Sequence, residues 1–159
     1  MELRIGFGFD VHKLEVGHQF WLGGILVPHT KGATGHSDAD VLVHAICDAL
    51  LGATNMGDIG KHFPDNDNKY KGIDSKLLLS RVNDLVCNKG YIICNIDSTI
   101  CLEKPKISDY TSNMSTTIAK CLNIEEDLIS VKATTTEKLS FVGREEGVSA
   151  YATVLLKKN

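Results

Sequence analysis

Short apolar runs, separated by polar segments that carry glycine, alternate along the chain and predict both strands and helices. Residues 3–12 alternate large apolar side chains with glycine and polar residues, which is the pattern of a strand covered on one face. Residues 19–27 predict a second strand, and residues 15–18 predict the hairpin turn that joins the two. The chain is therefore expected to begin with an antiparallel pair.

Two helices are predicted next. Ser37 or Asp38 is expected to cap a helix that reaches about Leu51, because a side-chain oxygen at that position satisfies free backbone N–H groups. Asp74 is expected to cap another, in which apolar residues recur at helical spacing as far as the stop signal at Gly90.

The rest of the chain predicts loops and the remaining layers. A glycine-bounded loop is expected at 32–35, and a long polar loop at 55–72 has a length typical of a functional segment. A strand, a helix, a strand, a loop and a closing strand are then expected at 91–102, 105–122, 129–133, 134–147 and 148–156. This order predicts a single α+β domain over 1–159, in which a mixed β-sheet packs against helices on one face.

Composition narrows the classes of function. With 43% hydrophobic and 23% charged residues the chain is typical of a globular domain. A net charge of -3 argues against a dedicated nucleic-acid binder, and no apolar stretch approaches the ~20 residues that span a bilayer. No secretory signal is visible, so the protein is expected in the cytoplasm if bacterial, and in a plastid-type organelle if a transit peptide has been removed. Five cysteines without a Cys-x-x-Cys pair predict buried free thiols.

Asp10 and His12 are the first candidate metal ligands. Two residues apart on a strand, their side chains point to the same face, and a carboxylate with an imidazole suits zinc or a similar divalent ion. His44, on the predicted helix, is the candidate third ligand, which leaves one coordination position open. Asp40 or Asp48, four residues to either side of His44, is expected to orient its ring. The alternative is that His44 is a core histidine and Asp10 a turn residue.

Three further segments carry polar groups suited to a phosphorylated ligand. His36 and Ser37, at the start of the predicted helix, are placed to donate hydrogen bonds to a phosphate. The hydroxyls of 134–136 offer further donors, and Glu137 offers a carboxylate to a cation such as Mg²⁺. The loop 57–65 mixes small, acidic and aromatic residues that could close over a polyol. Each also has an ordinary structural explanation, as a helix cap, a strand end or a surface loop.

Six motifs occur in order along the chain, at 8–12, 36–38, 44, 58–60, 63–65 and 132–138. Together they resemble, essentially end to end, the family of 2-C-methyl-D-erythritol 2,4-cyclodiphosphate synthases. The resemblance implies a fold like that of the trimeric Bacillus chorismate mutase, and a lyase of the non-mevalonate (methylerythritol phosphate) route to isoprenoids. In the implied reaction, the 2-phosphate of 4-diphosphocytidyl-2-C-methyl-D-erythritol 2-phosphate attacks the β-phosphorus, CMP leaves, and a cyclic diphosphate forms.

The resemblance also implies roles for single residues. Zinc is implied at Asp10, His12 and His44, and Mg²⁺ or Mn²⁺ at Glu137 together with the substrate diphosphate. His36 and Thr135 are implied to steady the attacking phosphate and the transition state. The other residues implied to contact the substrate are Asp10, His12, Ser37, Asp58, Ile59, Gly60, Phe63, Pro64, Asp65, Leu102, Lys106, Thr134, Thr136 and Glu137.

The family is a homotrimer with active sites between subunits. Residues matching Phe141 and Arg144 line a cavity on the three-fold axis that can hold an isoprenoid diphosphate. Two departures are visible: many members carry a proline where 108–110 stand here, and Glu145 replaces a common glycine, which is expected to weaken anion binding in the axial cavity. A zinc-dependent phosphohydrolase and a trimeric module that only binds isoprenoid diphosphates are the alternative functions.

Overall fold

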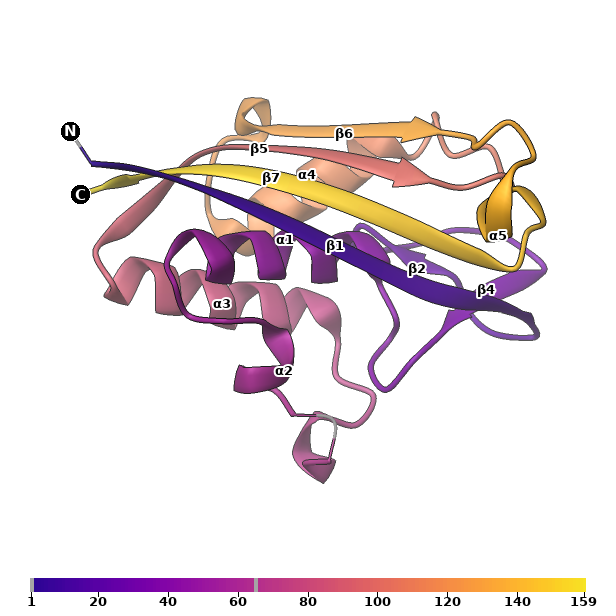
Figure 1. Cartoon of the computed structure of the whole chain (residues 1–159), viewed down its shortest axis with the longest axis horizontal. Coiled ribbons are helices and arrows are strands. Elements are labelled where there is room, and N and C mark those ends of the chain that lie inside the picture. Colours follow the sequence, from indigo (N-terminus) through magenta and orange to yellow (C-terminus); the bar gives the residue numbers. More distant parts are fainter. Residues whose placement is uncertain (1, 65) are drawn as a thin grey trace.

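A computed structural model describes residues 2–64 and 66–159 of the chain. Its strands are β1 (Leu3–Val16), β2 (Trp21–Leu22), β3 (Ile25–Leu26), β4 (Lys31–Thr34), β5 (Tyr91–Cys101), β6 (Ile129–Thr134) and β7 (Gly147–Lys158). One sheet has the order β4-β1-β7-β5-β6, and β2 pairs with β3 in a separate hairpin. In the sheet, β5 and β6 run parallel and the other neighbours antiparallel (Figure 1). The expected mixed sheet is therefore confirmed.

The long helices lie on one face of this sheet (Figure 1). They are α1 (Val41–Ala53), α3 (Ser75–Asn88) and α4 (Thr111–Leu122). Shorter helical turns are α2 (Ile59–His62), η1 (Asn68–Tyr70), η2 (Glu126–Leu128) and α5 (Ser140–Gly143). No helix of the described residues is long and apolar enough to cross a membrane. The α+β class with helices on one face is confirmed.

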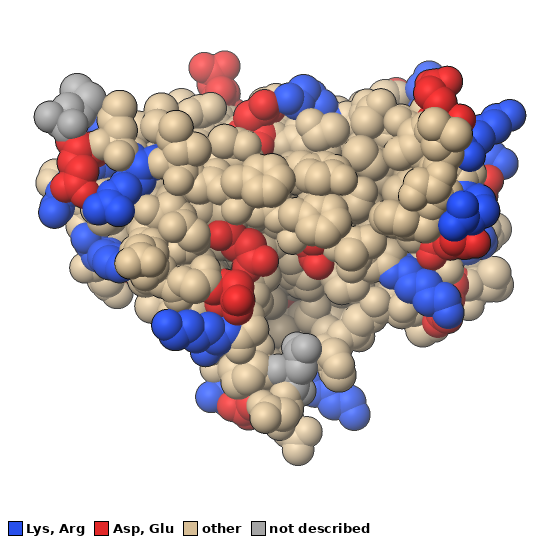
Figure 2. All heavy atoms as spheres, in the orientation of Figure 1, with Lys and Arg blue, Asp and Glu red and all other residues tan. Residues whose placement is uncertain are grey.

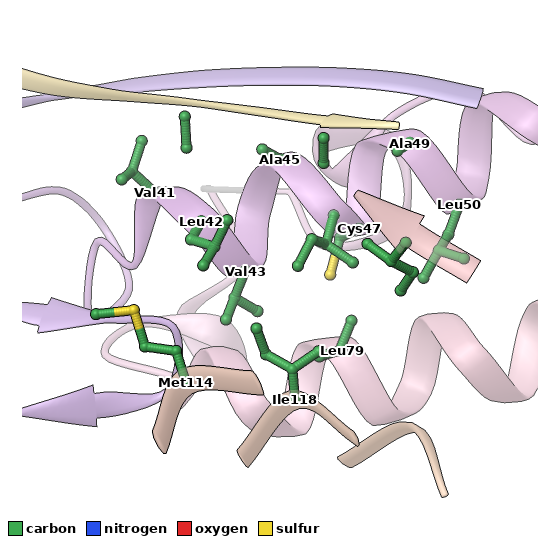
Figure 3. Close-up of a cluster of buried hydrophobic side chains, with 14 of the residues drawn as sticks. Val41, Leu42, Val43, Ala45, Cys47, Ala49, Leu50, Leu79, Met114 and Ile118 are labelled. Atoms are coloured by element: carbon green, nitrogen blue, oxygen red, sulfur yellow. The ribbon is translucent and has the colours of Figure 1, made fainter. Parts of the chain in front are cut away.

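Helix α1 packs unusually close to β1 because β1 presents glycines to it. A Cβ atom built on Gly6 or Gly8 would lie 1.9 Å from the carbonyl oxygen of Ala49 or Ala45, respectively. Figure 3 shows Ala45 and Ala49 directed toward the strands, and Val43 directed toward α3 and α4. The small residues in both elements therefore set the distance between helix and sheet, and with it the distance between the side chains that each element carries.

The opposite face of the sheet is open and apolar. The exposed large side chains on β1 and β7 include Leu3 (51%), Ile5 (73%), Phe7 (63%), Phe9 (44%), Val11 (43%) and Tyr151 (39%). The rings of Phe9 and Tyr151 lie 5.1 Å apart, so the side chains form one surface. Figure 2 shows the same region, over β1 and β7, largely free of charged groups. Exposed apolar surfaces of this extent mark sites of association.

The predicted opening hairpin is wrong. β1 pairs with β4, which overlaps the expected loop 32–35, and 19–27 splits into β2 and β3. The split occurs at Gly23 and Gly24, whose φ angles are +61° and +78°. Their N–H groups donate to the carboxylate of Asp40, at 2.9 and 2.6 Å, instead of joining a strand ladder.

Two predicted helix starts are also wrong. Asp40, not Ser37 or Asp38, caps α1, and its carboxylate accepts from Val43 N at 3.1 Å. The helix expected from 105 begins at Thr111, because 108–110 form a turn, in which Tyr110 N donates to Ile107 O at 2.9 Å, and Ile107 is buried ahead of it (3% exposed). The cap of α3 at Asp74 is confirmed.

The loops and cysteines differ in detail from expectation. The predicted loop 55–72 contains α2 and η1, and the predicted loop 134–147 contains α5, since short helical turns leave little periodic signal. All five cysteines are free, as expected. Burial was expected for them and holds for Cys47, whereas Cys87 is exposed and the other three are half-buried.

Candidate active site

Three potential metal ligands converge where β1 meets α1. Asp10 Oδ2 lies 2.9 Å from His12 Nε2 and 3.1 Å from His44 Nδ1, and the two imidazole nitrogens lie 3.2 Å apart. Two nitrogens bound tetrahedrally to zinc at ~2.05 Å are about 3.3 Å apart. The structure therefore brings the three residues into a spacing that fits a tetrahedral ion with one further position.

Hydrogen bonds on the far side of each ring direct a free lone pair to this point. His12 Nδ1 lies 3.0 Å from the carbonyl oxygen of Thr34, which can only accept, so Nε2 carries no proton when the ring is neutral. His44 Nε2 lies 2.9 Å from Ser75 Oγ and 3.1 Å from Ser37 Oγ, which leaves Nδ1 facing Asp10. Such outer hydrogen bonds are typical of metal-binding histidines.

The expectation that Asp40 or Asp48 orients His44 is wrong. Asp40 is fully buried and caps α1, whereas Asp48 Oδ1 accepts from Ile59 N at 2.8 Å. Helical side chains lean toward the helix N-terminus, so the ring of His44 reaches the segment before α1 rather than a carboxylate along the same helix.

Asp10, His12 and His44 shift one another's ionisation. Burial opposes ionisation of Asp10, but without a metal ion, when the rings of His12 and His44 carry a second proton, their hydrogen bonds and charge outweigh it and lower the pKa of Asp10 to about 2. Burial also disfavours protonation of His44, and the hydrogen bond and charge of Asp10 outweigh that effect and raise the pKa of His44. The carboxylate is thus ionised at neutral pH, as a metal ligand must be.

A cavity of about 400 Å³ opens beside this cluster. Figure 2 shows a hollow below the apolar surface of β1 and β7, with acidic groups beside it. The cavity is lined by the three candidate ligands and by Gly35, His36, Ser37, Asp48, Ile59, Gly60, Phe63, Tyr70, Ile73 and Leu78. It therefore brings together residues of five of the six sequence motifs, all but 132–138.

The loop that covers the cavity is tied down near both ends. Its first turn, α2, is capped by Asp58, which accepts from Lys61 N at 3.0 Å. Further along, Phe63 packs edge-on against Tyr70, with ring centroids 5.3 Å apart. Gly72 N donates to the carbonyl oxygen of His36 at 2.8 Å. Pro64 is half-buried in this loop, and the predicted contact Asp65 lies outside the described residues.

Other predicted contacts lie elsewhere in the chain. Lys106 and the segment 134–137 follow β5 and β6, and β7 and β5 stand between β1 and β6 in the sheet. Leu102 is buried, and its N–H donates to Thr134 O at 3.0 Å. None of these residues is among those that line the described cavity.

The triplet of hydroxyls is bound within its own turn. Thr134 Oγ1 donates to Thr135 O at 3.1 Å, and Thr136 Oγ1 donates to Leu139 O at 2.7 Å. Thr135 Oγ1 donates to Glu137 Oε1 at 3.3 Å, so the Glu137 carboxylate lies beside the hydroxyl predicted to steady the transition state.

Comparison with known proteins settles the family. A family model described as "YgbB family" matches residues 3–157. The chain belongs to the YgbB family. It is 61% identical over 158 residues to the 2-C-methyl-D-erythritol 2,4-cyclodiphosphate synthase of Bacteroides fragilis, covering 99% of each chain. It is 58% identical to the synthase of the same name from Bacteroides thetaiotaomicron, over the whole of both chains.

Solved structures agree with this family assignment. The chain matches the bifunctional IspDF of Campylobacter jejuni with a TM-score of 0.96 and 42% identity, over 99% of this chain and 43% of that one. It matches a CDP complex of IspF from Plasmodium falciparum with a TM-score of 0.87 and 36% identity, over 99% and 97%. The family expected from the motifs, a cyclising phosphorus–oxygen lyase of isoprenoid biosynthesis, is confirmed.

The residues predicted to face an axial cavity sit in and after α5. Phe141 is half-buried, and Arg144 is exposed and paired with Glu146 at 3.0 Å. Glu145, the departure from the family pattern, pairs with Lys104 at 3.1 Å. This ion pair offsets the negative charge that the substitution adds.

Sequence reasoning missed Tyr70 and Ser75. Tyr70 packs on Phe63 and lines the cavity, and Ser75 contacts His44. Neither residue stands in a motif, and both reach the site only through tertiary packing.

Proposed function

We propose that the protein holds zinc between Asp10, His12 and His44 and converts 4-diphosphocytidyl-2-C-methyl-D-erythritol 2-phosphate into 2-C-methyl-D-erythritol 2,4-cyclodiphosphate and CMP. The observation that carries this proposal is the convergence of three ligand atoms beside a cavity, in a chain 61% identical to a named synthase. The named relatives favour this cyclising reaction over the phosphohydrolase and the binding module.

The donor set fits zinc. One carboxylate and two neutral imidazoles leave a position for a substrate phosphate oxygen, and each ring already has its other nitrogen engaged. When bound, zinc acts as a Lewis acid that withdraws charge from the phosphate it contacts.

The polar groups at the rim of the cavity suit a phosphorylated polyol. Ser37 Oγ accepts from Ala39 N at 3.2 Å and from His44 Nε2, so its hydrogen is free to donate to a phosphate oxygen. His36 is exposed beside it and is placed to steady the attacking phosphate. Gly60 and Phe63, which line the cavity, and Asp58, which caps the α2 turn next to them, would bound the polyol and exclude water. Positioning of this kind supplies most of the catalysis in phosphoryl transfer.

The remaining substrate contacts come from a second subunit. In one chain, Lys106 and 134–137 lie across the sheet from the candidate ligands, so a complete site needs a neighbouring copy. The open apolar face of β1 and β7 supplies a surface for such association. A homotrimer like the Bacillus chorismate mutase assembly meets both requirements.

In that assembly, Lys106 and 134–137 of the neighbouring copy form the second half of the site (the second half-site), which would hold the CDP portion of the substrate. Glu137 would hold Mg²⁺ or Mn²⁺ together with the substrate diphosphate, and the ion would neutralise the phosphate charge. Lys106 would face the phosphates, and the hydroxyls of 134–136 would exchange their present acceptors for phosphate oxygens. The backbone at Leu102 would face the cytidine. Two of the structural relatives are named as complexes or bound forms with CDP.

The three-fold axis is the proposed site of a further ligand. Phe141 and Arg144 of each copy would surround it, as the family resemblance implies. Lys104 pairs with Glu145 and offsets the negative charge of the added carboxylate. An anionic isoprenoid diphosphate would therefore still bind on the axis.

Metal dependence of CMP release tests the proposed function. The purified protein is stripped with a chelator, and CMP release from the substrate is followed with Mg²⁺ present and zinc added back. We expect activity to be lost on stripping and restored by about one equivalent of zinc. Full activity in the stripped protein, or in the His44→Ala variant, would contradict the proposal.

A further inference from the structure

Ser75 is a fully buried serine whose hydroxyl contacts a candidate metal ligand. It is the first residue of α3, and its Oγ lies 2.9 Å from His44 Nε2. Asp38 holds it twice: Asp38 Oδ2 accepts from Ser75 N at 2.9 Å, and Asp38 Oδ1 accepts from the Ser75 hydroxyl. The backbone N–H of Asp40 also donates to Asp38 Oδ1, at 3.3 Å.

Counting hydrogens fixes the direction of these bonds. A serine hydroxyl has one hydrogen, and the ionised carboxylate of Asp38 can only accept. The Ser75 hydrogen therefore goes to Asp38, and Ser75 Oγ is left to accept from His44. His44 must then carry its proton on Nε2, which places the lone pair of Nδ1 toward Asp10 and His12.

We propose that Asp38 and Ser75 are positioning residues, which hold the ring of His44 in the tautomer and orientation that a metal ion requires. The inference rests on the proposed function, because it assigns the His44 ring to the metal. Asp38 acts through Ser75, and Ser75 acts through His44. Ser37 Oγ, 3.1 Å from the same nitrogen, is a second acceptor, so loss of Ser75 weakens the arrangement without abolishing it.

The same contact connects the metal site with the loop over the cavity. Ser75 directly follows the segment 54–74, which contains α2 and η1. The loop is thus anchored at its end to a metal ligand, and near its beginning to Asp48 on the same helix as His44. Ser75 therefore sets the position of His44 and of the end of this loop together.

Metal affinity tests the inference directly. Ser75→Ala, Asp38→Asn and the double variant are compared with the wild type, and Ser98→Ala is the matched control. Ser98 is also a buried serine (2% exposed), but its hydroxyl donates to Ser130 O on β6, away from the site. Zinc dissociation constants are measured by competition with a chromophoric chelator, and Co²⁺ absorption spectra report the ligand geometry.

We expect Ser75→Ala and Asp38→Asn each to raise the zinc dissociation constant by about 10- to 100-fold and to change the Co²⁺ spectrum. The double variant should match Ser75→Ala, because Asp38 acts through Ser75. Ser98→Ala should bind zinc as the wild type does. Thermal unfolding of the metal-free proteins checks folding, and Asp38→Asn replaces Ser75→Ala as the deciding variant if the latter does not fold.

The outcomes separate the two proposals. Tight zinc binding by the wild type, with Ser75→Ala and Asp38→Asn indistinguishable from Ser98→Ala, overturns this inference and leaves the proposed function standing. Additive losses in the double variant overturn the link from Asp38 through Ser75. A folded wild type that binds no zinc overturns the proposed function and the inference together.

Discussion

His44 Nδ1 on α1 lies 3.1 Å from Asp10 Oδ2 on β1, although 34 residues separate the two in sequence. The two side chains meet because helix and strand are in backbone contact at Gly8 and Ala45. The metal site is therefore a product of the packing between β1 and α1, and changes in that packing should be felt at the site.

Gly8→Ala should disrupt both stability and metal binding. The new Cβ would lie 1.9 Å from Ala45 O, which is backbone and cannot rotate away, so α1 must shift. We expect a loss of about 3 kcal/mol or more in the free energy of unfolding, measured in urea, and weaker zinc binding. Gly52→Ala, near the end of α1, is the control. The nearest atom to its new Cβ would be Phe7 O, at 4.0 Å. That variant should gain up to about 1 kcal/mol.

Asp40→Ala should be among the most destabilising changes of a helix cap in this chain. Its buried carboxylate accepts from Gly23 N, Gly24 N and Val43 N, so removal leaves three buried donors without a partner. We expect a loss of about 3 kcal/mol in denaturant unfolding. Asp74→Ala, which removes an exposed cap that accepts from Lys76 N, should cost about 1 kcal/mol. Equal losses would show that the contacts of Asp40 with 23–24 contribute nothing.

Stability in acid should depend on Glu2. Its hydrogen bonds from Tyr91, at 2.6 Å, and from Arg4 lower the pKa of Glu2 to about 2 from an ordinary 4.5. A carboxyl whose folded pKa is depressed stabilises the fold above the unfolded pKa and loses that contribution as pH falls. Between pH 4.5 and 2 the wild type should therefore lose stability more steeply than Glu2→Gln. Tyr91→Phe should reduce the difference, and parallel pH profiles of thermal unfolding for wild type and Glu2→Gln would contradict the assignment.

Phe9→Asp should break the proposed assembly without breaking the metal site. Phe9 is 44% exposed on the open sheet face, next to Tyr151, so a charge there is tolerated in a monomer but not inside an interface. We expect a smaller mass by light scattering, loss of turnover and unchanged zinc affinity. Ser112→Asp, on the exposed surface of α4, is the control and should leave the mass unchanged. A Phe9→Asp protein of wild-type mass would argue against association through this face.

The sequence predicts those parts of the fold that local pattern determines. Alternation identifies β1, and two-residue spacing on a strand places Asp10 and His12 together, as the structure has them. The glycines of that alternation also contact α1, and this contact cannot be predicted from the local sequence. The cap of α1 is missed because Ser37, Asp38 and Asp40 are equally good cap residues, and the choice depends on contacts with 23–24.

In the candidate site too, local motifs predict some residues and tertiary packing supplies the others. The three metal-ligand candidates and the rim at 36–37 follow from motifs, whereas Ser75 contributes through tertiary packing that no spacing predicts. Helical spacing predicts an orienting partner for His44 on α1, whereas the structure has it at Ser75 on α3. The second half-site cannot be placed next to the first within one chain, since its residues follow strands on the other side of the sheet.

The identity of the phosphorus product shows whether this protein cyclises its substrate. Substrate is incubated with the zinc-loaded protein and Mg²⁺, and the products are read by ³¹P NMR together with released CMP. We expect equal amounts of CMP and of a cyclic diphosphate in which each phosphorus carries one ester oxygen and shares the bridging anhydride oxygen, and no such product with His44→Ala. A 2,4-bisphosphate formed by hydrolysis, or tight binding of substrate without turnover, would contradict the cyclising reaction.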